Sequence, residues 1–488
     1  MALISLAILF WFSLLRYSHV AIGYYFGYTL YLWMEGLILV GFLLYFRFGI
    51  WKQSGTRENL RLAAPPVAGP AAQHQSDPLL SLRFLACLLV LTGHSVLVDF
   101  PPGHLMDDIH DDCWYSYLLP EPWAGIWIFF ILSGYLMGKG FFSGRYDKNV
   151  SSCISFYRNR CLRIVPLYAF ATLLIGALVL PTLFYPINFM RWVTLFVFFD
   201  FGPKPVPISA LWSVGTEMEF YLMVPFIFVL FGNFFTKNSL FCFATVSFAG
   251  FINRMIMQSY LPHMEITFGG PAWGNMDLFL SGFILNALVR RYRDQFKFQH
   301  GLALALVILA GYYLIAAWFC RDGRLLLEEL PYWGLLVILP TLSIGVVSTV
   351  IFLMETSPMP SGGFLIGRLI RWTQFPGLLT YSLYVWHEPI YIAASRDLQN
   401  ATDVSLSLSS ALGIMALNII KVTLIAIPSY YLIELYFERK KAVVVHGLSP
   451  GHVGAHHDEK EEKWEKATGG FLKKLFDPLE TPKKKSKE

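Results

Sequence analysis

Two ionisable side chains, Arg83 and His94, interrupt SLRFLACLLVLTGHSVLV, an apolar segment long enough to cross a bilayer. Eleven residues separate them, close to three helical turns, so both side chains project from one face of a helix, about 16 Å apart along its axis. Ionisable groups at membrane depth are costly in lipid and usually line a substrate path, a relay or an ion pair. This pair is therefore the first candidate for chemistry. The alternative is that Arg83 anchors one helix end and that His94 reaches interfacial water.

A group of arginines in FYRNRCLRIVPLY is the second candidate. Arg160 and Arg163 share one helical face, just before Pro166 at the expected cytoplasmic mouth of a membrane helix. Guanidinium groups suit the geometry of phosphate oxygens, so the cluster predicts a site for a phosphorylated cytoplasmic donor. A set of positive-inside anchors is the alternative.

Polar residues also occur inside two other apolar segments. In LWSVGTEMEFYLMVPF, Glu217 enters the membrane from the outer side, where it can orient an arginine or histidine, accept a sugar hydroxyl or form a structural ion pair. In YSLYVWHEPIYI, His387 stands two residues before Pro389, which kinks a helix and frees backbone carbonyls. His387 is therefore a candidate for a site residue, with a hydrogen-bonded kink as the alternative.

The composition is typical of a membrane protein. Hydrophobic residues make up 55% of the 488 residues and charged residues only 15%, against about 25% in soluble proteins. We therefore expect an all-α fold, a polytopic membrane helix bundle. The net charge of +5 is small and gathers on one side of the membrane, which argues against nucleic-acid binding. The six cysteines lack metal-ligand spacing, so no metal is expected.

Hydropathy predicts twelve membrane helices, at 2–17, 20–46, 79–99, 124–141, 164–182, 212–232, 238–258, 273–290, 301–319, 332–353, 374–396 and 406–436. If these helices alternate across the membrane, the clusters of lysine and arginine fall on one side, which is the cytoplasmic side. This alternation requires 188–200 not to cross, so 183–211 is expected to be an outer loop with a partly embedded piece.

Four regions follow from this pattern. Residues 1–51 hold two N-terminal transmembrane helices, and 52–78 form a Pro/Ala-rich cytoplasmic linker. Residues 79–440 form a ten-helix core, and 441–488 form a charged cytoplasmic tail that is expected to be disordered. A signal peptide is the alternative for the first apolar run, but that run has no basic residues before it.

Taken in order, these segments resemble the acyltransferase-3 family of membrane acyltransferases from about residue 79 to residue 440. The family's pattern of arginine, ten residues and histidine matches Arg83 and His94, and its FF-x-LSGYL segment matches Phe129 to Leu136. Further matching positions are Arg160, Arg163, Pro166 and Tyr168; Trp212, Ser213, Val214, Glu217, Phe220 and Tyr221; Tyr381 to Pro389, with Val385 for leucine and Thr380 for serine; and Ser429, Tyr430, Ile433, Glu434 and Phe437. Tyr436 replaces the family's proline, which leaves the local bend open.

The resemblance implies an acyl-coenzyme A, most often acetyl-coenzyme A, as co-substrate and no permanently bound cofactor. It implies an acceptor hydroxyl on a cell-envelope carbohydrate or glycolipid, and a location in the bacterial inner (cytoplasmic) membrane. Many relatives append an esterase-like domain, for which the last residues here, 441–488, are too few and too polar. The chain is therefore expected to acylate the acceptor itself or to pass the acyl group to a separate envelope partner; the oligomeric state stays open, with a homo-oligomer as one alternative.

We expect His94 to act as general base on the acceptor hydroxyl and Arg83 to bind the thioester end of the donor. The full assignment is His94, Arg83 and Glu217 for catalysis; Arg160, Arg163, Ser133 and Tyr135 for donor binding; and Trp212, Tyr221, His387 and Glu434 as supporting residues. Direct transfer and a covalent acyl-histidine relay both stay open. The alternative function is a transporter or flippase of lipid-linked saccharides, although no internal repeat is visible.

Overall fold

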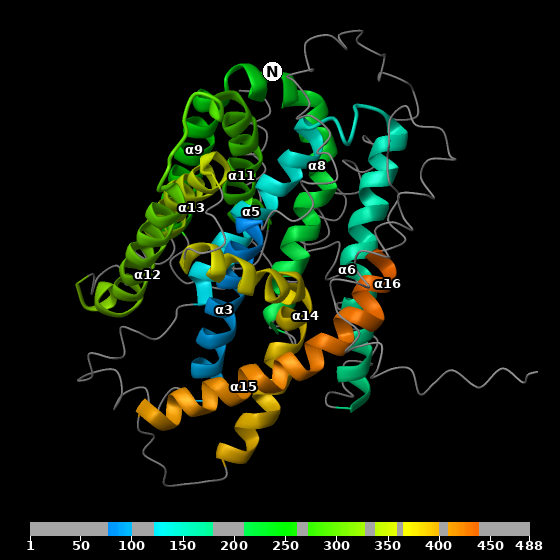
Figure 1. The fold of residues 1–488 in the computed structure, drawn as a ribbon, viewed down its shortest axis with the longest axis vertical. Coiled ribbons are helices and arrows are strands. Elements are labelled where there is room, and N and C mark those ends of the chain that lie inside the picture. Colours follow the sequence, from blue (N-terminus) through cyan, green and yellow to red (C-terminus); the bar gives the residue numbers. More distant parts are fainter. Residues whose placement is uncertain are drawn as a thin grey trace, which may run out of the picture. The chain divides into compact units, whose positions relative to one another are not determined.

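A computed structural model describes residues 77–99, 122–178, 209–260, 272–326, 337–358, 365–399 and 408–438. Within these ranges all regular structure is helical (Figure 1). The ten long helices are α3 (Pro78–Asp99), α5 (Pro122–Phe142), α6 (Val150–Leu178), α8 (Trp212–Lys237), α9 (Ser239–Tyr260), α11 (Ala272–Tyr292), α12 (Gly301–Leu326), α13 (Leu339–Thr356), α14 (Leu365–Gln399) and α15 (Leu408–Ser429). Three short elements are η4 (Ser209–Leu211), the π-helical η6 (Tyr430–Glu434) and α16 (Leu435–Glu438). The predicted all-α bundle is confirmed, whereas the predictions for 1–51, for most of 52–78 and 183–211, and for the tail lie outside the described residues.

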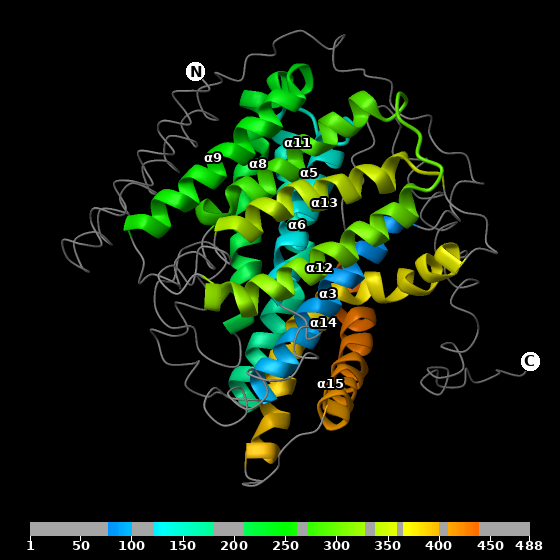
Figure 2. The ribbon, with the colours of Figure 1, turned by 90° about the vertical axis from the view of Figure 1, so that its left-hand side faces the viewer.

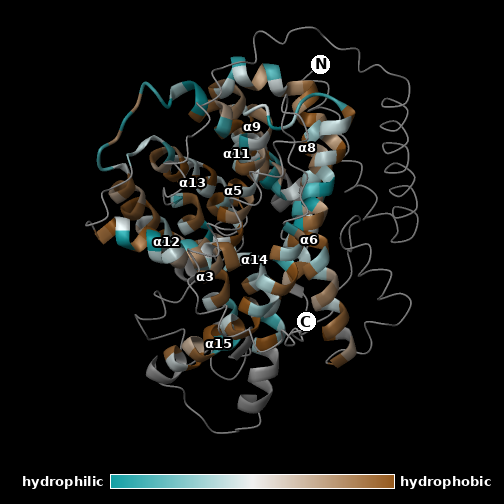
Figure 3. Ribbon diagram, turned by 45° about the vertical axis from the view of Figure 1, so that its right-hand side comes forward, coloured by the Kyte–Doolittle hydropathy of each residue, from teal (hydrophilic) through white to brown (hydrophobic). Residues whose placement is uncertain are grey.

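The bundle is built for a lipid environment. Six spans are long and apolar enough to cross a membrane: Pro78–Ser95, Pro122–Phe142, Trp212–Lys237, Gly301–Trp318, Leu339–Thr356 and Leu412–Glu438. Large apolar side chains such as Leu178, Leu240 and Val307 are exposed, and Figure 3 shows apolar residues along most of the helices. Such a surface suits lipid and not water. The chain is an integral membrane protein.

Helices α5 and α11 pack backbone to backbone in the interior of the bundle. A Cβ atom on Gly134 would lie 2.0 Å from the carbonyl oxygen of Phe279, and one on Gly282 would lie 2.0 Å from the carbonyl oxygen of Ile131. No side chain fits at either position, so the two glycines set the distance between these helices.

Helices α3 and α14 lie side by side and run in the same direction (Figure 2). At the start of α3, the backbone N–H of Asp77 donates to Gln374 Oε1, in the interior of α14, at 3.0 Å, while the Asp77 carboxylate caps α3 by accepting from the N–H of Leu79 at 2.9 Å. One turn further along α3, Ser81 Oγ accepts from Thr373 Oγ1 at 2.7 Å. This parallel pairing brings residues far apart in the chain to the same depth in the bundle.

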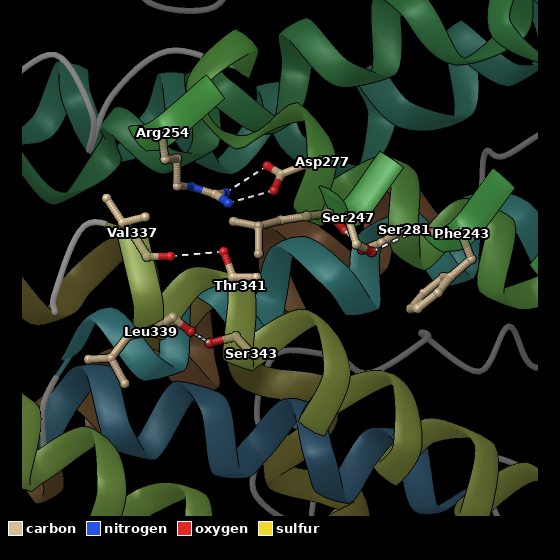
Figure 4. Close-up of polar contacts among 10 residues, drawn as sticks. Phe243, Ser247, Arg254, Asp277, Ser281, Val337, Leu339, Thr341 and Ser343 are labelled. Carbon is tan, nitrogen blue, oxygen red and sulfur yellow. Dashed lines mark hydrogen bonds and ion pairs between the residues drawn. The ribbon is translucent and has the colours of Figure 1, made fainter. Parts of the chain in front are cut away.

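A buried ion pair joins α9 to α11, away from these helices (Figure 4). Arg254 donates two hydrogen bonds of 2.6 Å to the carboxylate of Asp277, and the two residues are only 2% and 8% exposed. A Cβ atom on Gly250 would lie 2.1 Å from Asp277 Oδ2, so this glycine makes room for the carboxylate. Both charges are removed from lipid and satisfied by one another, as buried charges must be.

Helix α6 differs from the sequence-based prediction. It begins at Val150, well before the expected start at 164, so Arg160, Arg163 and Pro166 lie inside one helix. The N–H of Ser152 donates to the Asn149 side chain at 2.8 Å, which caps this earlier start. A prediction from apolar length misses the start because the first turns of α6 are polar.

Candidate active site

The two membrane histidines form a pair between α3 and α14. His94 Nδ1 lies 2.8 Å from His387 Nε2, and the rings stack with centroids 4.9 Å apart. His387 is fully buried, and His94 is partly exposed. The sequence singled out both residues but gave no sign that they touch.

The surroundings of His387 define which nitrogen of each ring carries a proton. His387 Nδ1 lies 2.5 Å from the carbonyl oxygen of Tyr384, which can only accept, so Nδ1 carries the hydrogen. In the neutral ring, His387 Nε2 is then an acceptor, and the hydrogen of the 2.8 Å bond belongs to His94 Nδ1. The lone pair of neutral His94 is therefore on Nε2, the nitrogen that faces away from the pair.

A cavity of about 520 Å³ lies between the helices, and neither His94 nor His387 is among the residues that line it. Six residues assigned from the sequence line it: Arg83, Ser133, Arg160, Arg163, Glu217 and Tyr221. Tyr384 also lines it, and its ring lies 5.2 Å from that of His387, so it connects the cavity to the histidines. The helices α3, α5, α6, α8 and α14 thus bring residues from five segments to one space.

Glu217 lies in the wall of the cavity and binds hydroxyl groups. Ser133 Oγ and Tyr221 Oη both donate to Glu217 Oε1, and the two hydroxyl oxygens are 2.8 Å apart. Tyr221 follows Glu217 by one helical turn on α8, whereas Ser133 comes from α5. Two protein hydroxyl groups, from α5 and α8, therefore hold Glu217 Oε1 in the cavity wall.

The two arginines of α6 that line the cavity, Arg160 and Arg163, have different surroundings. Arg163 forms ion pairs with Glu438 at 2.6 Å and with Glu434 at 2.9 Å, which fixes α6 to the end of the last helix. Arg160 has no ion pair within the described ranges; its guanidinium lies 5.6 Å from the ring of Tyr221 and 5.9 Å from that of Phe156. Its buried Nε atom has no hydrogen-bond partner in the described part of the chain. Arg160 is therefore the α6 arginine that can take up an anion.

Five assigned residues do not line the cavity: the His94–His387 pair, and Tyr135, Trp212 and Glu434. Tyr135 is buried on α5, and Trp212 packs against the rings of Trp123 and Phe130 at 5.7 and 6.0 Å. Glu434 is buried and accepts a hydrogen bond from Ser382 in addition to its ion pair. Tyr135, Trp212 and Glu434 therefore stabilise the helices around the cavity and do not contact a ligand inside it.

Sequence reasoning missed Tyr384, which links the cavity to His387. Tyr384 precedes His387 by three residues, one helical turn, and this spacing was the signal that it would lie beside the histidine. It also missed Glu388 as an anchor: its carboxylate accepts from the N–H of Ala210 at 2.6 Å and holds η4, which leads into α8. The His-Glu-Pro run thus combines a site residue with a structural contact.

Comparisons with known proteins give a family match that covers most of the described helices. Residues 80–432 match the family model Acyl_transf_3, described as an acyltransferase domain. Over 315 residues the chain is 23% identical to "Putative peptidoglycan O-acetyltransferase YrhL" of Bacillus subtilis (strain 168), covering 57% of this chain and 46% of that protein. Over 232 residues it is 25% identical to "Nodulation protein 10" of Rhizobium leguminosarum bv. viciae, covering 42% of this chain and 60% of that protein.

The matches to these relatives therefore span about half of their lengths. No solved structure matches the chain significantly. The family model, however, extends from the third residue of α3 to the middle of η6 and so includes all the assigned site residues except Glu434. This chain belongs to the acyltransferase-3 family.

Proposed function

We propose that this protein is a membrane O-acyltransferase that moves an acyl group, in the first instance acetyl, from cytoplasmic acyl-coenzyme A to a hydroxyl of a cell-envelope sugar or glycolipid. The observation that carries the proposal is the His94–His387 pair, which Tyr384 connects to the cavity that Arg83 and Arg160 line. The printed name of the Bacillus relative, a peptidoglycan O-acetyltransferase, supports the choice of acyl group and of acceptor class. The cytoplasmic membrane, with the tail on the cytoplasmic side, is the location that fits this direction of transfer.

In this mechanism His94 acts as the general base. Its Nε2 lone pair takes the proton of the acceptor hydroxyl as the oxygen attacks the thioester carbonyl. The tetrahedral intermediate then collapses, the carbon–sulfur bond breaks, and the proton on His94 passes to the departing thiolate. His387 is a positioning residue, because it accepts from His94 Nδ1 and so keeps the reactive lone pair on Nε2.

The cavity arginines bind the donor. Arg160 has no acidic partner in the described ranges, so it can bind the phosphates of coenzyme A without breaking an ion pair. Arg83 lies about three helical turns from His94 on α3 and lines the cavity, where it orients the donor. An acyl-histidine formed at His94 Nε2 and then attacked by the acceptor is the covalent version of the same reaction.

The test uses purified protein in liposomes with acetyl-coenzyme A. Acyl transfer is measured as the rate at which free coenzyme A thiol is released. We expect His94→Ala to abolish turnover while donor binding persists. We expect Arg160→Ala to raise KM for the donor, whereas Arg158→Ala, an exposed arginine on the same helix outside the cavity lining, leaves KM unchanged. Failure of the wild-type protein to bind the donor would contradict the proposal and favour saccharide transport instead.

A further inference from the structure

A lysine lies on the apolar outer face of α15. Lys421 is exposed, and so are its neighbours on that face, Leu417, Ile420 and Leu424. Of the six spans long enough to cross a membrane, the one containing Lys421 is the least covered, with 28% of its residues buried. Within the described residues Lys421 makes no hydrogen bond or ion pair. A lysine facing the lipid interior without a partner is costly.

Lys421 cannot turn into the bundle to find a partner. The opposite face of α15 packs against the bundle: Asn418 donates to Ser95 Oγ on α3 at 3.1 Å, and Val422 and Ala426 are fully buried. Because these contacts fix the rotation of α15, the exposed face stays outward. The partner of Lys421 must come from outside the described helices.

The same chain contains an acidic residue suited to this position. The apolar segment 20–46, which the sequence predicts to be a membrane helix, carries Glu35, and this is the single acidic residue in the first 51 residues. With the topology predicted from the positive charges, 20–46 and α15 both run from the outer to the cytoplasmic side. A carboxylate and an ammonium group thus occur inside two parallel membrane helices.

The glycines of both segments agree with this pairing. Gly413 precedes Lys421 by eight residues, and Gly27 precedes Glu35 by eight residues, about 12 Å along a helix in each case. Gly413 is exposed, and nothing lies within 4 Å of a Cβ atom built on it, so it offers an open place for close approach of another helix. Gly27 forms a G-x-x-x-G pair with Gly23, a spacing that favours close helix packing in membranes. One register therefore sets glycine against glycine and Glu35 against Lys421.

We propose that the exposed face of α15 is the docking surface for the segment 20–46 of the same chain, with Glu35 paired to Lys421 and Gly27 placed against Gly413. The pair neutralises the lysine inside the membrane, and the segment covers the least buried span of the bundle. Docking does not depend on the catalytic cavity.

The first test is crosslinking in the full chain in native-like membranes. The variant Gly27→Cys with Gly413→Cys is oxidised, since a close helix contact brings the two α-carbons within disulfide range. We expect a disulfide within one chain. The matched control is Gly27→Cys with Gly345→Cys, because Gly345 on α13 is another open glycine, and it should give none. Single-cysteine variants report any bond to the native cysteines. No bond between positions 27 and 413, or a bond only between two copies, would overturn the proposal.

The second test is a charge exchange, read by thermal unfolding in nanodiscs. Glu35→Lys and Lys421→Glu each place like charges side by side, so we expect each to lower Tm by roughly 2 °C or more. The double variant restores the opposite charges and should recover most of that loss. If the double variant is as unstable as the sum of the two single variants, the two residues do not interact and the proposal fails.

Discussion

His94 and His387 are joined by a 2.8 Å hydrogen bond between Nδ1 of the first ring and Nε2 of the second, across two parallel helices. The backbone carbonyl of Tyr384 accepts the hydrogen bond from the Nδ1–H group of His387. A buried partner thus fixes the tautomer of His94, the residue that we propose to move the proton. The partner of His94 is a second histidine. Since Nδ1 of neutral His387 carries a hydrogen, this ring can accept a hydrogen bond only through Nε2.

We predict that His387→Ala lowers kcat by roughly 10²-fold, because His94 loses the acceptor that keeps its lone pair on Nε2. KM for the donor should stay unchanged. His387→Gln should recover part of kcat, since an amide oxygen can accept from His94 Nδ1. Steady-state kinetics of the three proteins measure this, together with His94→Ala/His387→Ala. If the double variant is much slower than His94→Ala, the two histidines do not act as one unit.

We predict that Arg163→Ala destabilises the protein by roughly 3 kcal/mol, since it leaves the acidic groups of Glu434 and Glu438 without their shared cation. Thermal unfolding measures the loss. Adding Glu434→Gln should restore part of the stability, because one unpaired charge is removed. Arg160→Ala serves as the comparison and should leave Tm nearly unchanged, and an equal loss in both variants would contradict the different roles given to the two arginines.

We predict that Gly134→Ala destabilises the bundle by about 2 kcal/mol or more, because its Cβ would collide with the carbonyl oxygen of Phe279. Gly311→Ala on α12 is the matched control, since nothing lies within 4 Å of its Cβ. Its effect should stay within about 1 kcal/mol, the difference in helix propensity between the two residues. Equal Tm values for both variants would show that α5 and α11 are not in backbone contact.

We predict that Asp277→Ala destabilises the protein by roughly 3–5 kcal/mol, since Arg254 is then left as a buried charge without a partner. Arg254→Met with Asp277→Leu removes both charges and should recover most of this stability. Acyl transfer by the double variant at a temperature below its Tm should equal that of the wild type, because neither residue lines the cavity. A loss of activity without a change in Tm would require a role for the pair in the reaction.

The sequence was sufficient for the fold class and for much of the site, and the reason is helical periodicity. Arg83, Arg160 and Glu217 each stand out because a charge within or beside an apolar membrane segment usually faces the bundle interior. The partners of these residues were not predictable, because they lie far away along the chain. His387 follows His94 by 293 residues, and Glu438 follows Arg163 by 275.

Local rules also failed at two places. The first turns of α6 are polar, so apolar length placed the helix start too late. The pair of Arg254 and Asp277 escaped notice because each charge stands alone in its own apolar segment, and a single sequence does not say which helices will be neighbours.

The π-helical turn at Tyr430–Glu434 has a consequence for the shape of the last helix. It ends two residues before Tyr436, which stands where the family pattern has a proline. A π turn holds one more residue than an α turn, and each residue of a helix adds about 100° of rotation. The helix therefore changes phase at this point. Before the π turn, Leu424 and Ile425 face outward; after it, Glu438 faces Arg163 at the edge of the cavity. A one-residue deletion within Tyr430–Glu434 would turn Glu438 away from α6, so the length of this segment, more than its composition, aligns the end of the helix with the cavity.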